Sequence, residues 1–349
     1  MDDPNGARSE ETAPSGGRPN ALARLLGRID GFQRRHRWAA LPLAVNKRFG
    51  EHEGTRLAAT VSYYSFFSVF PLLLVFVTVL GLVLEDDSQL RQDLVDGALG
   101  QIPVLGQELA GNNPLQGSVL ALVIGLATAT WAGMGAAGAL QLGLEDVGDV
   151  PFYERGNFAF KRLRMILFLV AVAAGIAASV LLTNLARLFD VGPLAGALGL
   201  VATVAVNVVL TLAMMTVLPA RRRPVRELLP GAVVAGVLLA ALQLLGSFIV
   251  ARFVRGASDT YGTFAIVIGG LSWFHLVSRI LLLSAQLNEV LALDLWPRRL
   301  VGDTAMTEGD RRAMLLDVQR VQRDKAVGYA VSLNGAVASS EEPLGERTP

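Results

Sequence analysis

Five polar side chains recur on one face of the last long apolar stretch of the chain, which runs from Thr263 to Leu293. At 100° per residue, they share a sector of a helix about 100° wide. These residues are Ser272, His275, Arg279, Gln286 and Glu289. Lipid cannot solvate such a stripe, so we expect it to face other helices or a watery cavity, where an arginine attracts anions and a histidine carries protons. A rival interpretation places Arg279 near the end of a membrane span, with its side chain snorkelling to the interface.

Other apolar stretches also contain polar residues. In the first, hydroxyl side chains share a helical face with a proline, which cannot donate a backbone hydrogen bond. In the second and fourth, Gln141 and Asn207 are amides that can hydrogen-bond across helices. For each residue, packing between helices is the alternative to a role in a solute path. The complete set of candidates for such a path is Tyr64, Ser68, Pro71, Gln141, Asn207, Ser272, His275, Arg279, Gln286 and Glu289.

Six apolar stretches must position these residues, and each is long enough to cross a bilayer. They are predicted at residues 57–84, 117–144, 165–188, 194–218, 231–251 and 263–293. The chain is 52% hydrophobic and 17% charged, with a mean hydropathy of +0.46, which is too apolar for an ordinary soluble domain. The predicted fold class is therefore all-α, a polytopic membrane protein with six transmembrane helices.

Basic residues predict the orientation of this bundle. With the N-terminus inside, the inner segments 21–56, 145–164 and 219–230 carry 16 lysines and arginines, and the outer segments carry 4. The positive-inside rule then predicts a multi-pass plasma-membrane protein with both termini in the cytoplasm. Residues 21–56 hold 8 of the inner charges. They are expected to form basic amphipathic helices on an anionic membrane surface or a solvated linker.

The remaining segments read as tails and a cap. Residues 1–20 are predicted to be a disordered tail. The segment 85–116 has a net charge of −5 and is predicted to form a helical cap on the outer side, between the first two spans. Residues 294–349 are predicted to be a solvated cytoplasmic tail with a disordered end. Its helix is expected from Thr307 to about Tyr329, beginning with a Thr-x-x-Asp cap.

The sequence lacks the patterns that metal, nucleotide and covalent catalysis require. It contains no cysteine and three histidines, with no H-x-H, H-E-x-x-H, G-x-S-x-G or P-loop pattern. We therefore predict no metal site, no cofactor, no enzymatic activity and no nucleic-acid partner. The expected partners are membrane lipids and an anionic or amphiphilic solute, and a second copy of the chain stays an open alternative.

Two segments resemble a known family. AATVSYYSFFSVFPLLL at Ala58 to Leu74 and YGTFAIVIGGLSWFHLVSRILLLSAQLNEVLA at Tyr261 to Ala292 are similar to the signature regions of the YihY/BrkB family of bacterial inner-membrane proteins, and most similar to its YhjD-like branch. The resemblance extends over Leu41 to Leu295. It implies six spans, a plasma-membrane location and export of amphiphilic or lipid-like solutes. Members were once labelled ribonuclease BN. Where the family commonly has a glutamate, this chain has Gln286, followed by Glu289.

The leading hypothesis is a permease or flippase-like protein with a route between the first, second, fourth and sixth spans. The alternative is a non-transporting membrane scaffold for envelope partners, in which the polar stripe serves helix packing. A membrane-embedded hydrolase or nuclease is the third reading. Whether His275 and Arg279 face a solvated cavity or a closed helix contact distinguishes the first two hypotheses.

Overall fold

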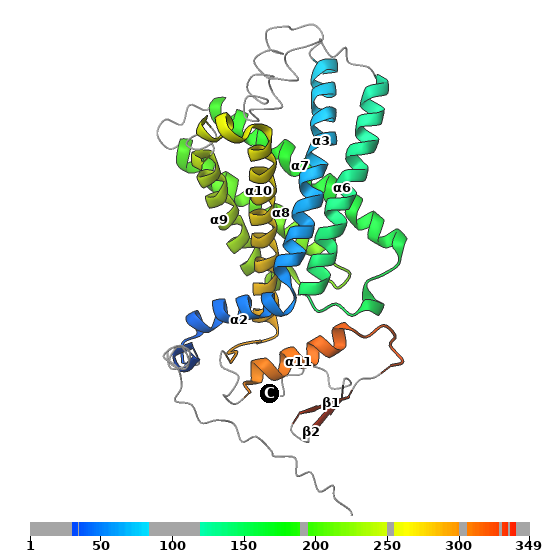
Figure 1. Cartoon of the computed structure of the whole chain (residues 1–349), viewed down its shortest axis with the longest axis vertical. Helices are drawn as coiled ribbons and strands as arrows, with labels where there is room; N and C mark the ends of the chain where they lie inside the picture. The colour runs from blue at the N-terminus through cyan, green and yellow to red at the C-terminus, as the bar shows by residue number, and fades with distance from the viewer. Residues whose placement is uncertain are drawn as a thin grey trace, which may run out of the picture.

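The structure is a computed structural model that describes residues 30–33, 35–83, 119–188, 195–249, 255–299, 306–327, 330–333 and 336–339. Within these residues six long helices form a bundle (Figure 1). They are α3 (Gly54–Val83), α6 (Val119–Val147), α7 (Phe158–Leu188), α8 (Ala195–Val217), α9 (Val225–Ile249) and α10 (Arg255–Ala292). Four of them contain segments long and apolar enough to cross a membrane: Leu122–Val147, Gly196–Val217, Val225–Gly246 and Val267–Ala292. The chain is therefore a multi-pass, helical membrane protein. The count of six spans and the orientation stay predictions.

Each predicted span overlaps one helix, but four helices begin earlier than predicted, among them α3 at Gly54 rather than at residue 57 and α10 at Arg255 rather than at residue 263. Helix α7 starts at Phe158 rather than at residue 165, and α9 starts at Val225 rather than at residue 231. The reason is that basic side chains such as Lys161 can extend from the first turns of a helix into water or headgroups. The start of an apolar stretch therefore does not mark the start of its helix.

The six helices are packed in chain order around the bundle. Each contacts the next along the chain, from α3 through α6, α7, α8 and α9 to α10, and α10 closes the circuit by contacting α3. Helix α6 also contacts α10 across the bundle. Two shorter helices, α2 (Arg37–Glu51) and α11 (Glu308–Arg320), lie at one end of the bundle, at the bottom of Figure 1. We call this the basal end and the opposite one the distal end.

Burial is concentrated at the basal end. The main hydrophobic cluster joins α3, α6, α8, α9 and α10 through residues such as Val61, Leu144, Met214 and Leu282. Among the described residues, the largest fully buried side chains all belong to this end, and half of them are polar. They are Arg48, Met214, Leu218, Leu282, Leu295, Gln33, Gln141, Gln286, Glu145, Val147, Val290 and Asn288. A polar interior of this kind must be paired internally, because apolar surroundings solvate neither charges nor amides.

The basic region before the first span does form a helix, α2, but it is more than a surface element. Trp38 is 69% exposed on its outer side, whereas Arg48 in its last turn is 0% exposed. Helix α2 packs against α10 and α3. The charge of Arg48 was predicted to face solvent or lipid headgroups, and this expectation is wrong, because carboxylates from other elements surround it.

The C-terminal tail also differs from the prediction. Helix α11 has the expected Thr307–Asp310 capping box but ends at Arg320, well before Tyr329. It is not solvated on all sides, since Leu316 packs against Val45, Val290 and Leu295. Strands β1 (Ala330–Leu333) and β2 (Ala336–Ser339) then pair antiparallel. The sequence between them is Asn-Gly, the dipeptide preferred in tight hairpins, and this signal was overlooked. The predicted tail 1–20 and cap 85–116 lie outside the described residues.

Candidate functional site

A network of buried polar residues closes the basal end of the bundle. Its members come from segments far apart in the sequence: the end of α2, the turn after α6, the connection before α9 and the last turns of α10. We call it the basal network and define it by Arg48, His52, Asp149, Arg223, Gln286, Asn288 and Glu289. Helix ends position all of these residues, so the network is where the membrane helices are tied to one another.

The centre of the basal network is an ion pair between Arg48 and Asp149. Arg48 Nη2 donates to both carboxylate oxygens of Asp149, each at 2.8 Å, in a pair whose side chains are 0% and 1% exposed. His52 Nε2 lies 2.9 Å from Asp149 Oδ1, and its Nδ1 lies 2.9 Å from Gln286 Oε1. One chain of contacts therefore joins α2, the end of α6 and α10.

The backbone at Asp149 is unusual because its φ is +50°. Few residues other than glycine adopt this left-handed conformation, although aspartate and asparagine tolerate it better than most. It follows the end of α6, where Gly148 N donates to Leu144 O and Val150 N donates to Glu145 O. The turn thereby presents the Asp149 carboxylate to Arg48, and the ion pair in turn holds the backbone in this conformation.

Electrostatics favours the charged forms of this pair. Burial alone would raise the pKa of Asp149, but the hydrogen bond with His52 and the charge of Arg48 outweigh it, so its pKa lies below the ordinary value. Burial likewise opposes ionisation of Arg48, yet the attraction of Asp149 prevails and raises the pKa of the guanidinium. Removing either partner would leave an uncompensated buried charge, which is far more costly than removing the pair.

His52, Asp149 and Asp317 are the described residues whose ligand atoms lie close enough together to hold a metal ion. Arg48 already binds this cluster, since its Nη1 lies 2.9 Å from Asp317 Oδ1 while its Nη2 contacts Asp149. A cation would have to displace the guanidinium and would then meet its charge. The cluster is therefore better described as an arginine site than as a metal site.

A second, part-buried ion pair joins α10 to the connection between α8 and α9. Arg223 Nε donates to Glu289 Oε1 at 2.8 Å, and Arg223 Nη2 contacts the other carboxylate oxygen. Burial opposes the charge on Arg223, but the attraction of Glu289 outweighs it and raises the arginine pKa. Next to Glu289, Asn288 accepts from Gly231 N at 2.7 Å and donates to Leu228 O at 3.0 Å. These contacts fix the start of α9 against α10.

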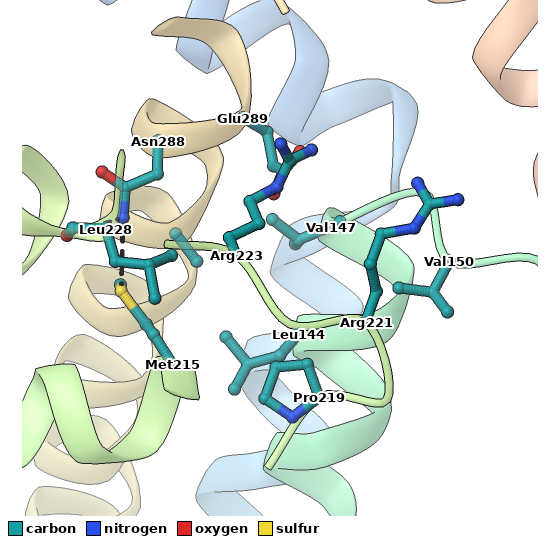
Figure 2. A pocket seen from close by; sticks show the side chains of 12 residues that line it. Leu144, Val147, Val150, Met215, Pro219, Arg221, Arg223, Leu228, Asn288 and Glu289 are labelled. Carbon is teal, nitrogen blue, oxygen red and sulfur yellow. Dashed lines mark hydrogen bonds and ion pairs between the residues drawn. The ribbon is translucent and has the colours of Figure 1, made fainter. Parts of the chain in front are cut away.

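A small cavity of about 40 Å³ lies beside this pair (Figure 2). In Figure 2, Arg223 reaches toward Glu289, while Leu144, Val147 and Met215 form apolar walls. The cavity is big enough for water molecules and too small for an organic solute. This cavity is thus closed to anything larger.

The C-terminal helix is tied to the same end. Asp310 accepts from Lys47 Nζ at 2.9 Å and from Arg298 Nε at 2.8 Å, and Arg298 also pairs with Glu51 at 2.6 Å. Burial would raise the pKa of Asp310, but hydrogen bonds from Thr307, the backbone of Arg299, Arg298 and Lys47 hold it well below its ordinary range. Helix α11 is therefore held against α2 by charges as well as by Leu316.

Comparisons with known proteins match the region that carries this network. The family model of virulence factor BrkB matches residues 45–301. The chain belongs to this family. The match includes Arg48, His52, Asp149 and Glu289 but ends before α11, so the α11 contacts lie beyond the matched region.

Two curated relatives are similar over most of their length. The chain is 26% identical to "Putative ribonuclease-like protein YfkH" of Bacillus subtilis (strain 168) over 262 residues, 70% of this chain and 92% of the relative. It is 23% identical to "Inner membrane protein YhjD" of Escherichia coli (strain K12) over 265 residues, 70% of this chain and 78% of the relative. No solved structure matches the chain significantly. The inner-membrane relative and the apolar helices agree on a membrane location.

The predicted stripe on the last span does not share one environment. Gln286 and Glu289 are buried in the basal network, and His275 is half-buried. Ser272 and Arg279 are exposed on the bundle, and the Arg279 guanidinium lies 6.0 Å from the centre of the Phe49 ring on α2. The five residues therefore differ in burial, and the expectation that the stripe faces other helices or a watery cavity stays a prediction for the two exposed ones. Burial by neighbouring helices increases toward the basal end of α10, so one helical face passes from open to closed.

The other predicted residues are also separated from one another. Tyr64 is exposed on the outer wall, and Ser68 donates to Ser65 O within its own helix. Pro71 lies inside α3, which continues to Val83. Gln141 is buried and donates to Glu145 Oε1 at 3.2 Å. Asn207 donates to Gln243 Oε1 at 3.4 Å, which links α8 to α9 as expected for an amide between helices.

Sequence reasoning missed the most important residues of the network. Arg48 and His52 precede the first span, and Asp149 lies in a loop of mixed charge, so all three looked like solvated charges. Asn288 does lie within the second segment that resembles the family, Tyr261 to Ala292. One further signal was present, because Asp149 follows Gly148 at the end of an apolar stretch, where a left-handed turn is common.

Proposed function

We propose that the protein is a permease, exporter or flippase-like transporter of an anionic or amphiphilic solute, in which the basal network acts as a gate. The observation that carries the proposal is a seal made of buried, paired charges inside one end of a helical membrane bundle. Ionisable residues are expensive inside membrane proteins and, where they occur, usually serve a function. A purely structural core could use leucine at these positions at lower cost.

The chemistry of the seal suits repeated opening and closing. Ion pairs and hydrogen bonds are directional contacts that can be exchanged for water, whereas an interdigitated apolar core resists separation. Asp149 at the end of α6 contacts both Arg48 and His52, and His52 contacts Gln286 on α10, so withdrawing the Asp149 carboxylate would loosen both α2 and α10 from the end of α6. This coupling is what a gate in an alternating-access cycle requires.

Catalysis is a weaker reading of the same residues. Metal-assisted cleavage of phosphodiesters needs ligands that are free to hold ions around the scissile phosphate. The described cluster of His52, Asp149 and Asp317 is instead filled by Arg48. The ribonuclease-like name of the Bacillus relative therefore finds no counterpart in the geometry of this cluster, and we propose transport rather than hydrolysis.

Transport is tested with the purified protein in vesicles. We expect it to move a fluorescent anionic amphiphile across the bilayer faster than protein-free vesicles do, with or without an imposed proton gradient. Asp149→Asn is the gate variant, because asparagine tolerates the left-handed turn but lacks the charge that holds Arg48. Asp149→Asn should change the transport rate, whereas the control substitution Glu308→Gln, at an exposed residue, should not.

The scaffold hypothesis predicts a different result. If a panel of anionic and zwitterionic amphiphiles crosses no faster than in protein-free vesicles, the proposal of transport is wrong. Equal rates for the wild type and Asp149→Asn, both above background, would instead contradict the assignment of the gate while keeping transport.

A further inference from the structure

A second feature of the surface lies on the outer wall of the bundle, away from the basal network. It is a groove of about 450 Å³ between α3, α6 and α7. Its lining residues are Thr60, Tyr64, Trp131, Met134, Gly135, Gly138, Ala139, Leu142, Phe158, Lys161, Arg162 and Met165. The lining combines small residues of α6, aromatic side chains and two cations near the start of α7.

Glycines give the groove its depth. An added Cβ at Gly135 would lie 3.0 Å from the Tyr64 ring, and one at Gly138 would lie 3.1 Å from the Met165 methyl group. Larger residues at these positions would meet α3 and α7 side chains. Small residues on a membrane helix commonly allow another helix to approach. Here they leave room between side chains from both neighbours.

Neither of the two cations at the basal end of the groove has a direct ion pair among the described residues. Arg162 Nη1 contacts Met134 Sδ at 3.3 Å, and its guanidinium lies 5.0 Å from the centre of the Phe158 ring. Lys161 acts electrostatically on Glu145, which is buried. Within the part of the chain that the structure describes, no carboxylate is within ion-pair distance of either cation. An anion from outside the protein would pair with both cations.

The upper part of the groove is apolar and exposed. Trp131 is 78% exposed and lies on α6, and Leu142 at the basal end of the groove is 45% exposed on the same helix. These two residues are separated by about 16 Å along the helix axis, close to half of the roughly 30 Å hydrocarbon core. Tryptophan usually lies at a membrane interface. Trp131 lies about half the hydrocarbon thickness away from the basal end of the groove, so its exposed ring needs an apolar partner.

We infer that this groove binds an anionic lipid-like amphiphile from the basal leaflet, with its acidic headgroup on Lys161 and Arg162 and its acyl chain along α6 to Trp131. Charge complementarity selects the headgroup, because a zwitterionic lipid offers the two cations less net attraction. The apolar length selects a chain-bearing molecule over a soluble phosphate. The inference deepens the proposed function, since it names the substrate class and the side from which it enters.

Binding is measured on the purified full-length protein by native mass spectrometry, with phosphatidylglycerol and phosphatidylcholine of identical chains. We expect the wild type to prefer phosphatidylglycerol, and the double variant Lys161→Gln/Arg162→Gln to bind it about tenfold more weakly, a change of about 1.4 kcal/mol. Arg222→Gln removes an exposed cation outside the groove and is the matched control. Leu142→Trp keeps both cations and fills the groove, so it should also lose the preference.

The outcomes separate this inference from the proposed function. Equal phosphatidylglycerol binding by the wild type, the double variant and Leu142→Trp would overturn the site, even if vesicles show transport. Competition by glycerol phosphate as strong as by phosphatidylglycerol would overturn the role of the acyl chain. Selective binding without flux would uphold the site and contradict transport. A melting temperature equal to that of the wild type excludes misfolding as the cause of lost binding.

Discussion

The basal and distal halves of the bundle are built differently. At the basal end, large side chains are fully buried and charged residues are paired inside the protein. Toward the distal end, the described residues that are buried are small, such as Gly125, Ala240 and Gly246. The chain therefore seals one end of the bundle by its own contacts, whereas its distal half depends on lipid, on other parts of the chain or on a partner for cover. In our proposal the tightly packed basal end is the closed gate, and the distal half is packed less tightly.

The largest expected effect is at the central ion pair. Arg48→Met should lower the free energy of unfolding by about 3–5 kcal/mol, because the Asp149 carboxylate would remain buried without its partner. The measurement is reversible unfolding in mixed micelles. The control is Arg56→Met, which breaks a pair with Glu53 whose side chains are 75% and 60% exposed, and it should have little effect. Similar stabilities of the two variants would remove the distinction between buried and exposed charge.

Leucine truncation compares the two halves directly. Leu282 in the basal half of α10 is 0% exposed, and Leu120 near the distal end of α6 is 68% exposed. Leu282→Ala should cost about 2–5 kcal/mol of unfolding free energy, because it leaves a cavity among packed neighbours. Leu120→Ala removes no packed contact of this kind and should cost far less. An equal loss from both variants would show that the distal half is as tightly packed as the basal half.

Acid should release α11 from the basal end. The pKa values of Asp149 and Asp310 are lowered in the folded protein from an ordinary value of 3.8. Their contribution to stability is therefore complete above that value and is lost as the pH falls below it, through the folded pKa. Spin labels at cysteines introduced for Trp38 and Met314 would report the distance between α2 and α11, since the chain has no cysteine of its own.

The expected distance is constant from about pH 7 to about pH 5 and increases only below about pH 4. Asp310→Asn removes the carboxylate that Lys47 and Arg298 share, so its α11 should be held less tightly throughout the higher range. Release of wild-type α11 between about pH 5 and about pH 7 would mean that a group other than these carboxylates holds the helix.

The smallest effect is expected between α8 and α9. Asn207→Ala removes a hydrogen bond of 3.4 Å to Gln243 in a partly exposed setting. Such bonds between membrane helices contribute about 0.6 kcal/mol on average. A double-mutant cycle with Gln243→Ala in the same unfolding assay measures the coupling energy. A coupling energy comparable to the effect of Arg48→Met would show that this amide pair stabilises the bundle as strongly as the basal network does.

Much of the architecture was accessible from the amino-acid sequence. Each apolar stretch became one helix, and the Thr307 cap began a helix where expected. Membrane helices are readable in this way because a backbone in hydrocarbon must satisfy its own hydrogen bonds, so long apolar segments have few alternatives. The ends of helices were less accurate, since charged side chains on α7 begin the helix before the apolar stretch starts.

The candidate site was harder to predict. A helical wheel for α10 correctly grouped Gln286 with Glu289 but could not tell that Arg279 lies on the open side. It also gave no partner for either buried residue, because His52 and Arg223 are distant in the sequence. Angular position on one helix says which residues share a face, and only neighbouring helices decide whether that face is covered.

The sequence by itself determined the class of the protein, since hydropathy and helical hydrogen bonding are local properties that each apolar stretch carries alone. It also placed the basic residues in particular connections. Only the tertiary structure decided which charges are buried. Arg48 and Arg56 are both arginines in the basic segment before the first span, yet Arg48 is fully buried against Asp149 while Arg56 is exposed. The difference arises because burial and pairing depend on what other segments bring to the same place.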